Sequence, residues 1–597
     1  MKKLGIFIRK YEKNIAGASI IILILSFLTK LLGFIKIRLI ATTYGASREL
    51  DIFWASFVIP DLVFMLLIGG SLNAALIPTF VKLNKKNPKQ GRQVFNIVLT
   101  FTTLFWLISW FVFAWVIHTY APVLMSGILK IFAAQSHVGK LGLIESYYAN
   151  QSLLFANLST IMFASTLLLA ISSVIGAYLA SCHHFTVTNL SSLMYNLGII
   201  IALLTIKITG QINVYYLAFS IIFGSLLHLT TVLIFLVKQY PDVLKKLPKD
   251  VFFVVFKKAT SILNHVKNII KLSIPRILGL AVEHIVIIFN TFWALALKSG
   301  ALSILKYALS IHFLPIQLVG TSIAQAVFPT LSGQTDIKKF TRLFIRAFLI
   351  VFLISGYLAI LIYVLKFPIV YILLAGGRFT QKEVFITGLT LGALAGAVLI
   401  NSLMPLIMRA FYSLHQTKTP FFISLIGVLT SILATIAFSN LFGHPQVIAA
   451  LKLLMTKGDI SMLMKIFKHI PTYATTLARG PFSVVGLALG ISVGLIPEFI
   501  IALILLNKQV KGYLFKFMNG YAILSVSIFV TVSILAYFTN RFVKSIIFSH
   551  GGYQDVLPNL VVILIVSLIS AIPIVWTTYR IYVFKKVNHQ KQEFEQA

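Results

Sequence analysis

The chain has a single cysteine, Cys182, among its 597 residues, which excludes a fold held together by disulfide bonds. Acidic residues are also scarce, with 15 Asp and Glu against 51 Lys and Arg. All charged residues together make up 11% of the sequence, less than half of the roughly 25% that is typical of soluble domains. No GxxxxGK segment is present, so the sequence offers no phosphate-binding loop and no ATPase of its own.

Hydrophobic residues make up 58% of the chain, and the mean hydropathy is +0.94, values that indicate a membrane protein. Apolar runs long enough to cross about 30 Å of hydrocarbon recur along the whole length. We count about 14 such runs, near residues 15–42, 51–81, 94–119, 151–181, 188–207, 213–237, 269–297, 303–331, 343–366, 384–412, 420–440, 483–506, 517–539 and 557–579. Continuous runs of this length predict helices, because a helix satisfies its own backbone hydrogen bonds in lipid. The predicted fold class is an all-α polytopic membrane protein with about 14 transmembrane helices.

The net charge of +36 would suggest nucleic acid in a soluble protein, but the distribution of the charges argues against that partner. If the N-terminus is cytoplasmic and the spans alternate, the inside segments hold about twice as many Lys and Arg as the outside segments. The richest inside segments are 1–14, 82–93 and 238–271. This bias predicts cytoplasmic N- and C-termini, and it suits contact with anionic membrane lipids.

Several basic side chains fall inside predicted spans, and six of them are candidate site residues. They are Lys30, Lys36, Arg38, Arg276, Lys306 and Arg346. The spans contain only four acids, Asp51, Asp61, Glu283 and Glu498. A charge at the bilayer centre costs about 2.5–3.5 kcal/mol, so such residues normally face a protein interior or a water-filled cavity. The pattern predicts a positively biased cavity that accepts an anionic cargo, although Lys36, Arg38 and Lys306 could instead snorkel from helix ends, and Arg276 and Arg346 could anchor the inner surface.

Two segments of the chain resemble each other. The block 69–79, GGSLNAALIPT, aligns with the block 320–330, GTSIAQAVFPT. Upstream of these blocks, Gly45 precedes Pro60 by 15 residues, and Gly300 precedes Pro315 by the same 15. Both copies lie at the second helix of a half, and both helices are predicted to enter from outside. This arrangement predicts two parallel repeats, a plan that many transporters share.

At these same positions the chain resembles the MurJ (MviN) family of lipid II flippases. The matching segments are TKLLGF at 29–34, Tyr44-Gly45, Asp51, Ile59-Pro60-Asp61, ALIP at 75–78, Ile274-Pro275, ILG at 277–279, Asn290-Thr291, residues 322–332, GRFT at 377–380, AFYS at 410–413 and KTP at 418–420. Each motif alone is weak. The ordered set, which runs from about residue 15 to 440, is specific.

The resemblance implies a transporter of the MOP superfamily in the bacterial cytoplasmic membrane. Such a protein has two six-helix lobes and an extra helix pair. It encloses a cationic cavity for the diphosphate head of lipid II and a groove for the polyprenyl tail. The implied boundaries are an N-lobe at 1–238, a basic cytoplasmic linker at 239–270, a C-lobe at 271–507, and the extra helices with a cytoplasmic tail at 508–597. The implied protein is not an enzyme and carries no cofactor. No metal site is predicted, because Cys182-His183-His184 lies in a short loop without a fourth ligand.

The sequence departs from the family pattern in the residues that contact the cargo. An Asp-Arg pair of the family is replaced by Leu309-Ser310, and Lys306 lies one helical turn before Ser310, where it could restore the missing charge. We therefore predict that the substrate-binding residues are Lys30, Lys36, Arg276, Lys306 and Ser310. Asp51 and Glu283 are predicted to act in gating, and Arg276 and Glu283, seven residues apart, share a helix face.

Other function classes stay open at this point. A polysaccharide-lipid exporter would also want a basic cavity, whereas an exporter of cationic drugs would want an acidic one. A membrane-embedded glycosyltransferase would want acids at its outer loops, and the first outer loop offers only Glu49 and Asp51 beside Arg48. An inactive scaffold is the remaining alternative.

Overall fold

The computed structural model describes residues 15–66, 73–133, 141–248, 282, 284–416, 418–449, 469–476, 480–547 and 558–573. The elements named in this part of the chain are helices, and they form two compact units. Among the described residues, nine helices are long and apolar enough to cross a membrane, and three shorter apolar helices accompany them. The predicted all-helical membrane fold is therefore confirmed, while the count of about 14 spans stays a prediction.

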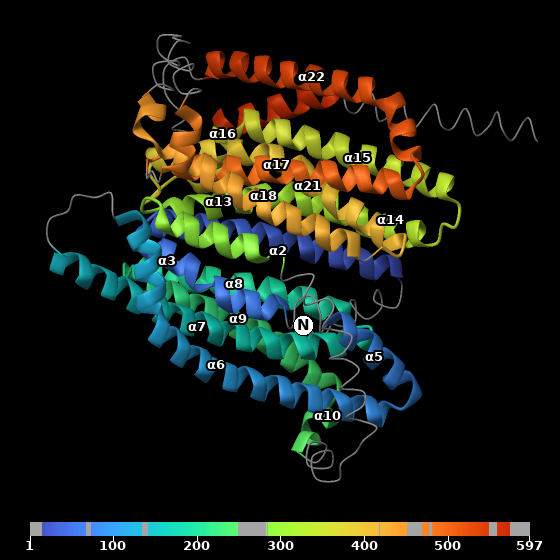
Figure 1. Cartoon of the computed structure of the whole chain (residues 1–597). Coiled ribbons are helices and arrows are strands. Elements are labelled where there is room, and N and C mark those ends of the chain that lie inside the picture. Colours follow the sequence, from blue (N-terminus) through green and yellow to red (C-terminus); the bar gives the residue numbers. More distant parts are fainter. Residues whose placement is uncertain are drawn as a thin grey trace, which may run out of the picture. The chain divides into compact units, whose positions relative to one another are not determined.

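The first unit comprises residues 1–302 and 376–378. Its helices are α2 (Ile15–Tyr44), α3 (Arg48–Ser56), α4 (Val58–Phe64), α5 (Asn73–Lys86), α6 (Pro88–Ala133), α7 (Leu141–Ser181), α8 (Phe185–Thr209), α9 (Val214–Gln239), α10 (Pro241–Lys245) and the helix His284–Ala296. All of them except α10 overlap spans predicted for this part of the sequence. Figure 1 shows these helices.

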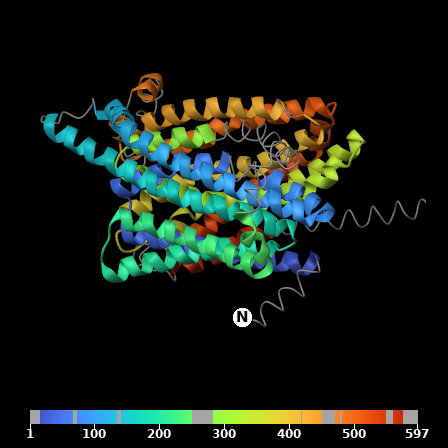
Figure 2. The ribbon, with the colours of Figure 1, turned by 90° about the horizontal axis from the view of Figure 1, so that it is seen from below.

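Helices α6 and α7 are longer than predicted. With 46 residues, α6 is about 69 Å long, more than twice the thickness of the hydrocarbon layer. It packs along the 41-residue α7 (Figure 2). The segment 121–150, predicted as an outer connection, thus consists largely of the continuing ends of two helices.

A half-buried histidine joins three helices of the first unit. His228 of α9 contacts the hydroxyl of Ser172 on α7 at 2.6 Å through Nδ1, and that of Ser191 on α8 at 3.1 Å through Nε2. Because the Ser191 hydroxyl donates to the Thr188 carbonyl, it accepts from Nε2–H, and Ser172 donates to Nδ1. Such polar contacts between helices stabilise a bundle in a membrane.

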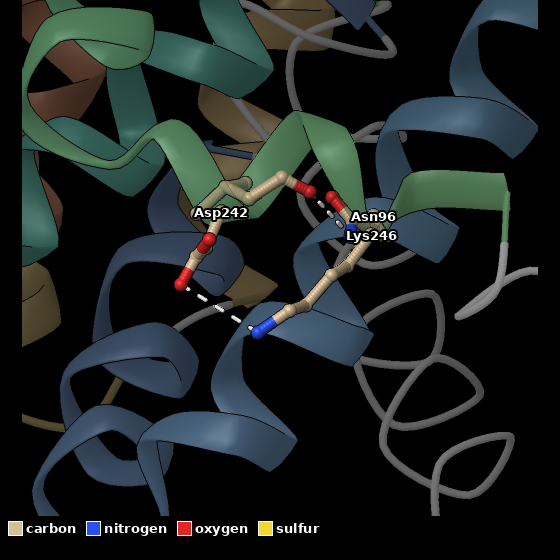
Figure 3. Close-up of polar contacts among 4 residues, drawn as sticks. Asn96, Asp242 and Lys246 are labelled. Atoms are coloured by element: carbon tan, nitrogen blue, oxygen red, sulfur yellow. Dashed lines mark hydrogen bonds and ion pairs between the residues drawn. The ribbon is translucent and has the colours of Figure 1, made fainter.

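The short helix α10 rests on the first turns of α6. The Asn96 amide of α6, a buried side chain, donates to the Val243 carbonyl at 2.9 Å. Asp242 and Lys246 form an exposed ion pair of 3.5 Å one turn apart (Figure 3). The first residues of the predicted linker 239–270 are therefore attached to the bundle, and residues 249–270 lie outside the described part of the chain.

The second unit comprises residues 303–375 and 379–597. Its elements are most of α13 (Ala301–Pro315), the π-helix η2 (Ile316–Thr321), α14 (Ser322–Ser332), α15 (Ile337–Val364), α16 (Lys366–Leu374), α17 (Gln381–Ser413), α18 (Lys418–Gly443), α21 (Ser483–Gln509), α22 (Tyr513–Ile547) and the helix Pro558–Pro573. The residue boundaries given above for the four domains stay predictions.

Helices α18 and α21 pack with their backbones in close contact. A Cβ atom at Gly490 of α21 would lie 2.5 Å from Cα of Thr435, and one at Gly494 would lie 2.3 Å from Cα of Ser431. Thr430 also donates its hydroxyl to the Gly494 carbonyl at 2.7 Å. Glycines at such crossings allow membrane helices to approach each other closely.

The sequence repeat corresponds to repeated local structure. Gly45 and Gly300 both have positive φ, +66° and +87°; Gly45 lies three residues before α3, and Gly300 directly precedes α13. π-helical backbone then follows α4 at residues 65–66 in the first half and α13 at residues 316–321 in the second. The π-helical residues therefore occupy matching positions of the two repeats. Because π-helical turns often mark functional sites, these positions are candidates for function.

Candidate functional site

Lys36 of α2 points towards α8 within the first unit. Its ammonium donates to Oδ1 of Asn196 at 2.9 Å and lies 5.4 Å from the centre of the Tyr195 ring. Asn196 in turn donates to the Thr29 carbonyl at 3.2 Å, which holds its amide in place. The side chain of Lys36 is thus turned towards α8, and its role in substrate binding stays a prediction.

The partner of Lys36 is neutral, which matters for the charge of the site. Among the described residues, Lys36 forms no ion pair, so Asn196 fixes its position without cancelling its charge. Lys30 lies on the same helix and is half-buried. The helix α2 therefore carries three cations, Lys30, Lys36 and Arg38, within a predicted span, and at least Lys36 is held by the bundle.

Asp51 is completely buried at the start of α3, and its Oδ2 accepts the N–H of Gly300 at 2.6 Å. Arg48, one turn earlier, donates to the Leu295 and Leu297 carbonyls, to the latter at 3.4 Å. Two charged side chains of the predicted outer loop thus hold the backbone that leads into α13. A carboxylate acceptor makes the bond to Gly300 stronger than one between neutral groups.

Two motifs from the family resemblance, Tyr44-Gly45 and GRFT at 377–380, meet at the end of α2. The N–H of Arg378 donates to the Thr42 carbonyl at 2.9 Å. A Cβ atom at Gly45 would lie 2.7 Å from the Arg378 carbonyl oxygen. The segment 376–378 accordingly belongs to the first compact unit, although it follows α16 in the chain. These motifs serve the backbone packing at one end of the unit.

The eighth predicted span contains Lys306 and Ser310 on α13, and both side chains are half-buried. The Ser310 hydroxyl donates to the Tyr307 carbonyl of its own helix at 2.6 Å. Two residues further, His312 is buried and contacts the amide of Asn401 on α17 at 3.3 Å. The roles predicted for Lys306 and Ser310 stay predictions.

The π-helix after α13 has a cationic partner. Arg409 of α17 donates to the Thr321 carbonyl, the last residue of η2, at 3.3 Å. Gly320 packs directly on α17, because a Cβ atom there would lie 2.5 Å from Cα of Ser402. Arg409 therefore hydrogen-bonds the irregular backbone of η2, and Gly320 allows η2 to approach α17.

Two of the predicted residues, Arg276 and Glu283, lie outside the described residues. The sequence reasoning missed Asn196, Asn401 and Arg409. A signal for the two asparagines existed, because an amide inside an apolar span needs a hydrogen-bonding partner. Arg409 was not among the candidate cations, and it belongs to the last turns of α17.

The fold is that of helical, multi-spanning transporters of the membrane. A solved lipid II flippase MurJ in an inward closed conformation has a TM-score of 0.64 and 19% identity, covering 94% of this chain and 100% of that chain. A multidrug resistance MATE family transporter of the MOP superfamily, in an inward-facing conformation, has a TM-score of 0.58 and 12% identity over 82% of this chain and 98% of its own.

The chain belongs to the lipid II flippase MurJ family, whose model matches residues 40–477. A probable lipid II flippase MurJ of Buchnera aphidicola subsp. Acyrthosiphon pisum is 25% identical over 76% of this chain and 84% of its own length. The lipid II flippase MurJ of Burkholderia cenocepacia is 25% identical over 70% and 77%, respectively. A probable lipid II flippase MurJ of Borreliella burgdorferi is 24% identical over 71% and 78%.

Proposed function

We propose that this protein is a flippase that carries lipid II, a polyprenyl-diphosphate-linked precursor of peptidoglycan, from the inner to the outer leaflet of the bacterial cytoplasmic membrane. The membership in the family supports this function. The observation in the structure that carries it is Lys36, a cation in a spanning helix that is held by the neutral Asn196 rather than by an acid.

The chemistry of the cargo requires such a group. A diphosphate cannot cross hydrocarbon without replacement of its hydration shell, and Lys or Arg can supply charge-assisted hydrogen bonds in place of water. A lysine that was paired with a carboxylate would have to lose that partner before it could bind an anion. Lys36 keeps a net positive charge, and its ammonium has two further N–H groups beyond the one donated to Asn196.

In this proposal the diphosphate contacts Lys30 and Lys36 of α2 during part of the transport cycle, and Lys306 with Ser310 of α13 supplies further contacts. Arg276 is assigned to the same group of residues. Asp51 holds the backbone at Gly300 in the conformation described here, and release of this bond accompanies the change of state. Glu283 is assigned a gating role with Arg276.

The orientation belongs to the same proposal. The excess of Lys and Arg in the segments 1–14, 82–93 and 238–271 supports cytoplasmic termini. With this orientation the turn at residues 45–51 lies at the outer surface, and the start of α15 lies at the inner surface. Transport by alternating access would then proceed from the cytoplasmic to the outer side.

The test is rescue of a bacterium that is depleted of its own lipid II flippase. We expect the unchanged chain to restore growth and Lys36→Met to fail at equal protein level, because the cation is lost. Lys207→Met removes an exposed lysine at the end of α8 and serves as the matched control, which should rescue. Rescue by Lys36→Met would remove the structural support for the proposal, and failure of the unchanged chain would contradict the function.

This experiment also separates the flippase from the exporter alternatives. A multidrug or polysaccharide-lipid exporter of the same fold would not restore growth after loss of lipid II transport. A transporter that served another polyprenyl-linked sugar would leave the depleted cells unable to build peptidoglycan, whatever its expression level.

A further inference from the structure

Exposed cations form a ridge at the start of α15. Lys338, Arg342 and Arg346 follow each other at intervals of four residues, and all three are exposed. Side chains at this spacing lie one above the other on a helix surface. We call these three residues the basic ridge.

Aromatic residues of α22 flank the basic ridge. The Lys338 ammonium lies 5.5 Å from the centre of the Tyr513 ring, and the Arg342 guanidinium lies 5.7 Å from that of Phe517. The two rings stack on each other with their centres 6.0 Å apart. These contacts keep the cationic groups at the seam between the two helices without reducing their charge.

The two helices run side by side from this point in the same direction (Figure 1). The pairs Lys338–Tyr513 and Arg342–Phe517 are followed by Phe352, whose ring centre lies 4.9 Å from that of Phe529. The seam therefore extends from the charged end into the apolar part of both helices.

Acidic side chains do not balance the basic ridge. Asp336 is the acid next to it, and its carboxylate accepts the Lys338 backbone N–H at 2.8 Å as the N-cap of α15. The sequence 505–547 contains no Asp or Glu but adds Lys508, Lys511 and Lys516 around the turn into α22. Within the described part of the chain, none of the three ridge cations forms an ion pair.

Exposed apolar side chains follow the cations along α15. Ile350 and Ile354 follow Arg346 at the same interval of four residues, with 47% and 36% of their surface exposed. On α22, Val530 and Ile534 are also about half exposed. The exposed surface of α15 thus changes from cationic to apolar along the helix, in the order of the headgroup and the acyl chains of a phospholipid.

We propose that the basic ridge binds the headgroup of an anionic phospholipid of the inner leaflet, whose acyl chains lie along the exposed apolar surface of α15 and α22. Cationic sites between membrane helices at the cytoplasmic surface suit such headgroups. A soluble anion would use the cations but not the exposed apolar row, so the combination favours a lipid. The assignment of the site to the inner leaflet rests on the proposed orientation of the chain. The binding of the lipid itself does not depend on the proposed cargo.

The test measures binding of dioleoyl-phosphatidylglycerol, with dioleoyl-phosphatidylcholine as the neutral lipid, to the purified full-length chain by native mass spectrometry. Each cation near an anionic lipid surface contributes about 1 kcal/mol. The combined variant Lys338→Gln, Arg342→Gln and Arg346→Gln should therefore bind phosphatidylglycerol about a hundredfold more weakly. Its binding of phosphatidylcholine should be unchanged.

The matched control removes three exposed lysines of α5, Lys82, Lys85 and Lys86, which lie in a segment predicted on the same side. It should bind phosphatidylglycerol like the unchanged protein. If the combined ridge variant does not fold, the single change Arg346→Gln should still lower the affinity about fivefold. Equal binding by ridge and control variants, or competition by inorganic phosphate at the concentration of the lipid, would overturn the proposal.

A labelling experiment tests the leaflet. In a chain with Cys182→Ser, the substitution Lys339→Cys places one thiol beside the basic ridge, and a membrane-impermeant reagent added to intact cells should not reach it. Labelling from outside would refute the inner leaflet. Binding of phosphatidylglycerol at the ridge in a chain that fails to rescue the flippase-depleted strain would contradict the proposed function alone.

Discussion

Asp51 offers a substitution whose effect can be worked out from the structure. Its carboxylate is buried and accepts the Gly300 N–H at 2.6 Å. Asp51→Ala removes the acceptor and leaves a peptide N–H without that bond at the start of α13. A hydrogen bond to a charged group contributes about 1.5–3 kcal/mol, so we expect the free energy of unfolding to fall by at least this amount.

Asp51→Asn has the same size and keeps a neutral carbonyl that can accept the same N–H. We expect it to lose only part of the stability, about 1 kcal/mol, because a bond between neutral groups replaces one to a carboxylate. Glu49→Ala, an exposed acid on the same turn of α3, is the control, and its loss should stay below about 1 kcal/mol.

The assay is thermal unfolding of the purified variants in one detergent, followed by helix content. The midpoint temperatures should decrease in the order Glu49→Ala, Asp51→Asn, Asp51→Ala. A midpoint for Asp51→Ala equal to that of Glu49→Ala would refute the reasoning, because the buried carboxylate would then not stabilise the backbone at Gly300.

Three further predictions concern the cations and the π-helix. Lys30→Gln and Lys306→Met should each abolish rescue of the flippase-depleted strain without lowering protein level, and full rescue by the double variant would place the cargo contacts elsewhere. Ser310→Arg should restore the activity that Lys306→Ser loses, since the two positions are about 6 Å apart along α13; normal transport by Lys306→Ser alone would contradict this compensation. Gly320→Ala should lower stability by about 1–3 kcal/mol, because its methyl group would overlap the Ser402 backbone, and an unchanged unfolding midpoint would argue against the contact.

Much of the fold follows from the sequence because hydrophobic runs of sufficient length have one stable solution in lipid. The predicted spans overlap helices throughout the described residues, and the repeat glycines Gly45 and Gly300 both have positive φ. The ends of α6 and α7 were predicted less well. A helix that leaves the membrane can continue beyond it when it packs against a neighbouring helix, and hydrophobicity alone does not reveal this.

The candidate site was predictable only in part. The cost of burying a charge identified Lys36 as a residue that needs a polar environment. Its partner Asn196 lies 160 residues away, and no local pattern connects the two positions. The bond between Asp51 and Gly300 is likewise a contact of a side chain with a distant backbone group, which periodicity and motifs do not reveal.

The most direct test of the account measures lipid II in the outer leaflet. Cells depleted of their own flippase and expressing this chain are treated with an enzyme that cleaves lipid II at its diphosphate and cannot cross the membrane. We predict that the added enzyme cleaves lipid II in cells with the unchanged chain. In cells with the Lys36→Met variant at equal protein level, lipid II should stay in the inner leaflet and escape cleavage. Lipid II that stays protected in cells with the unchanged chain would contradict the proposed flippase.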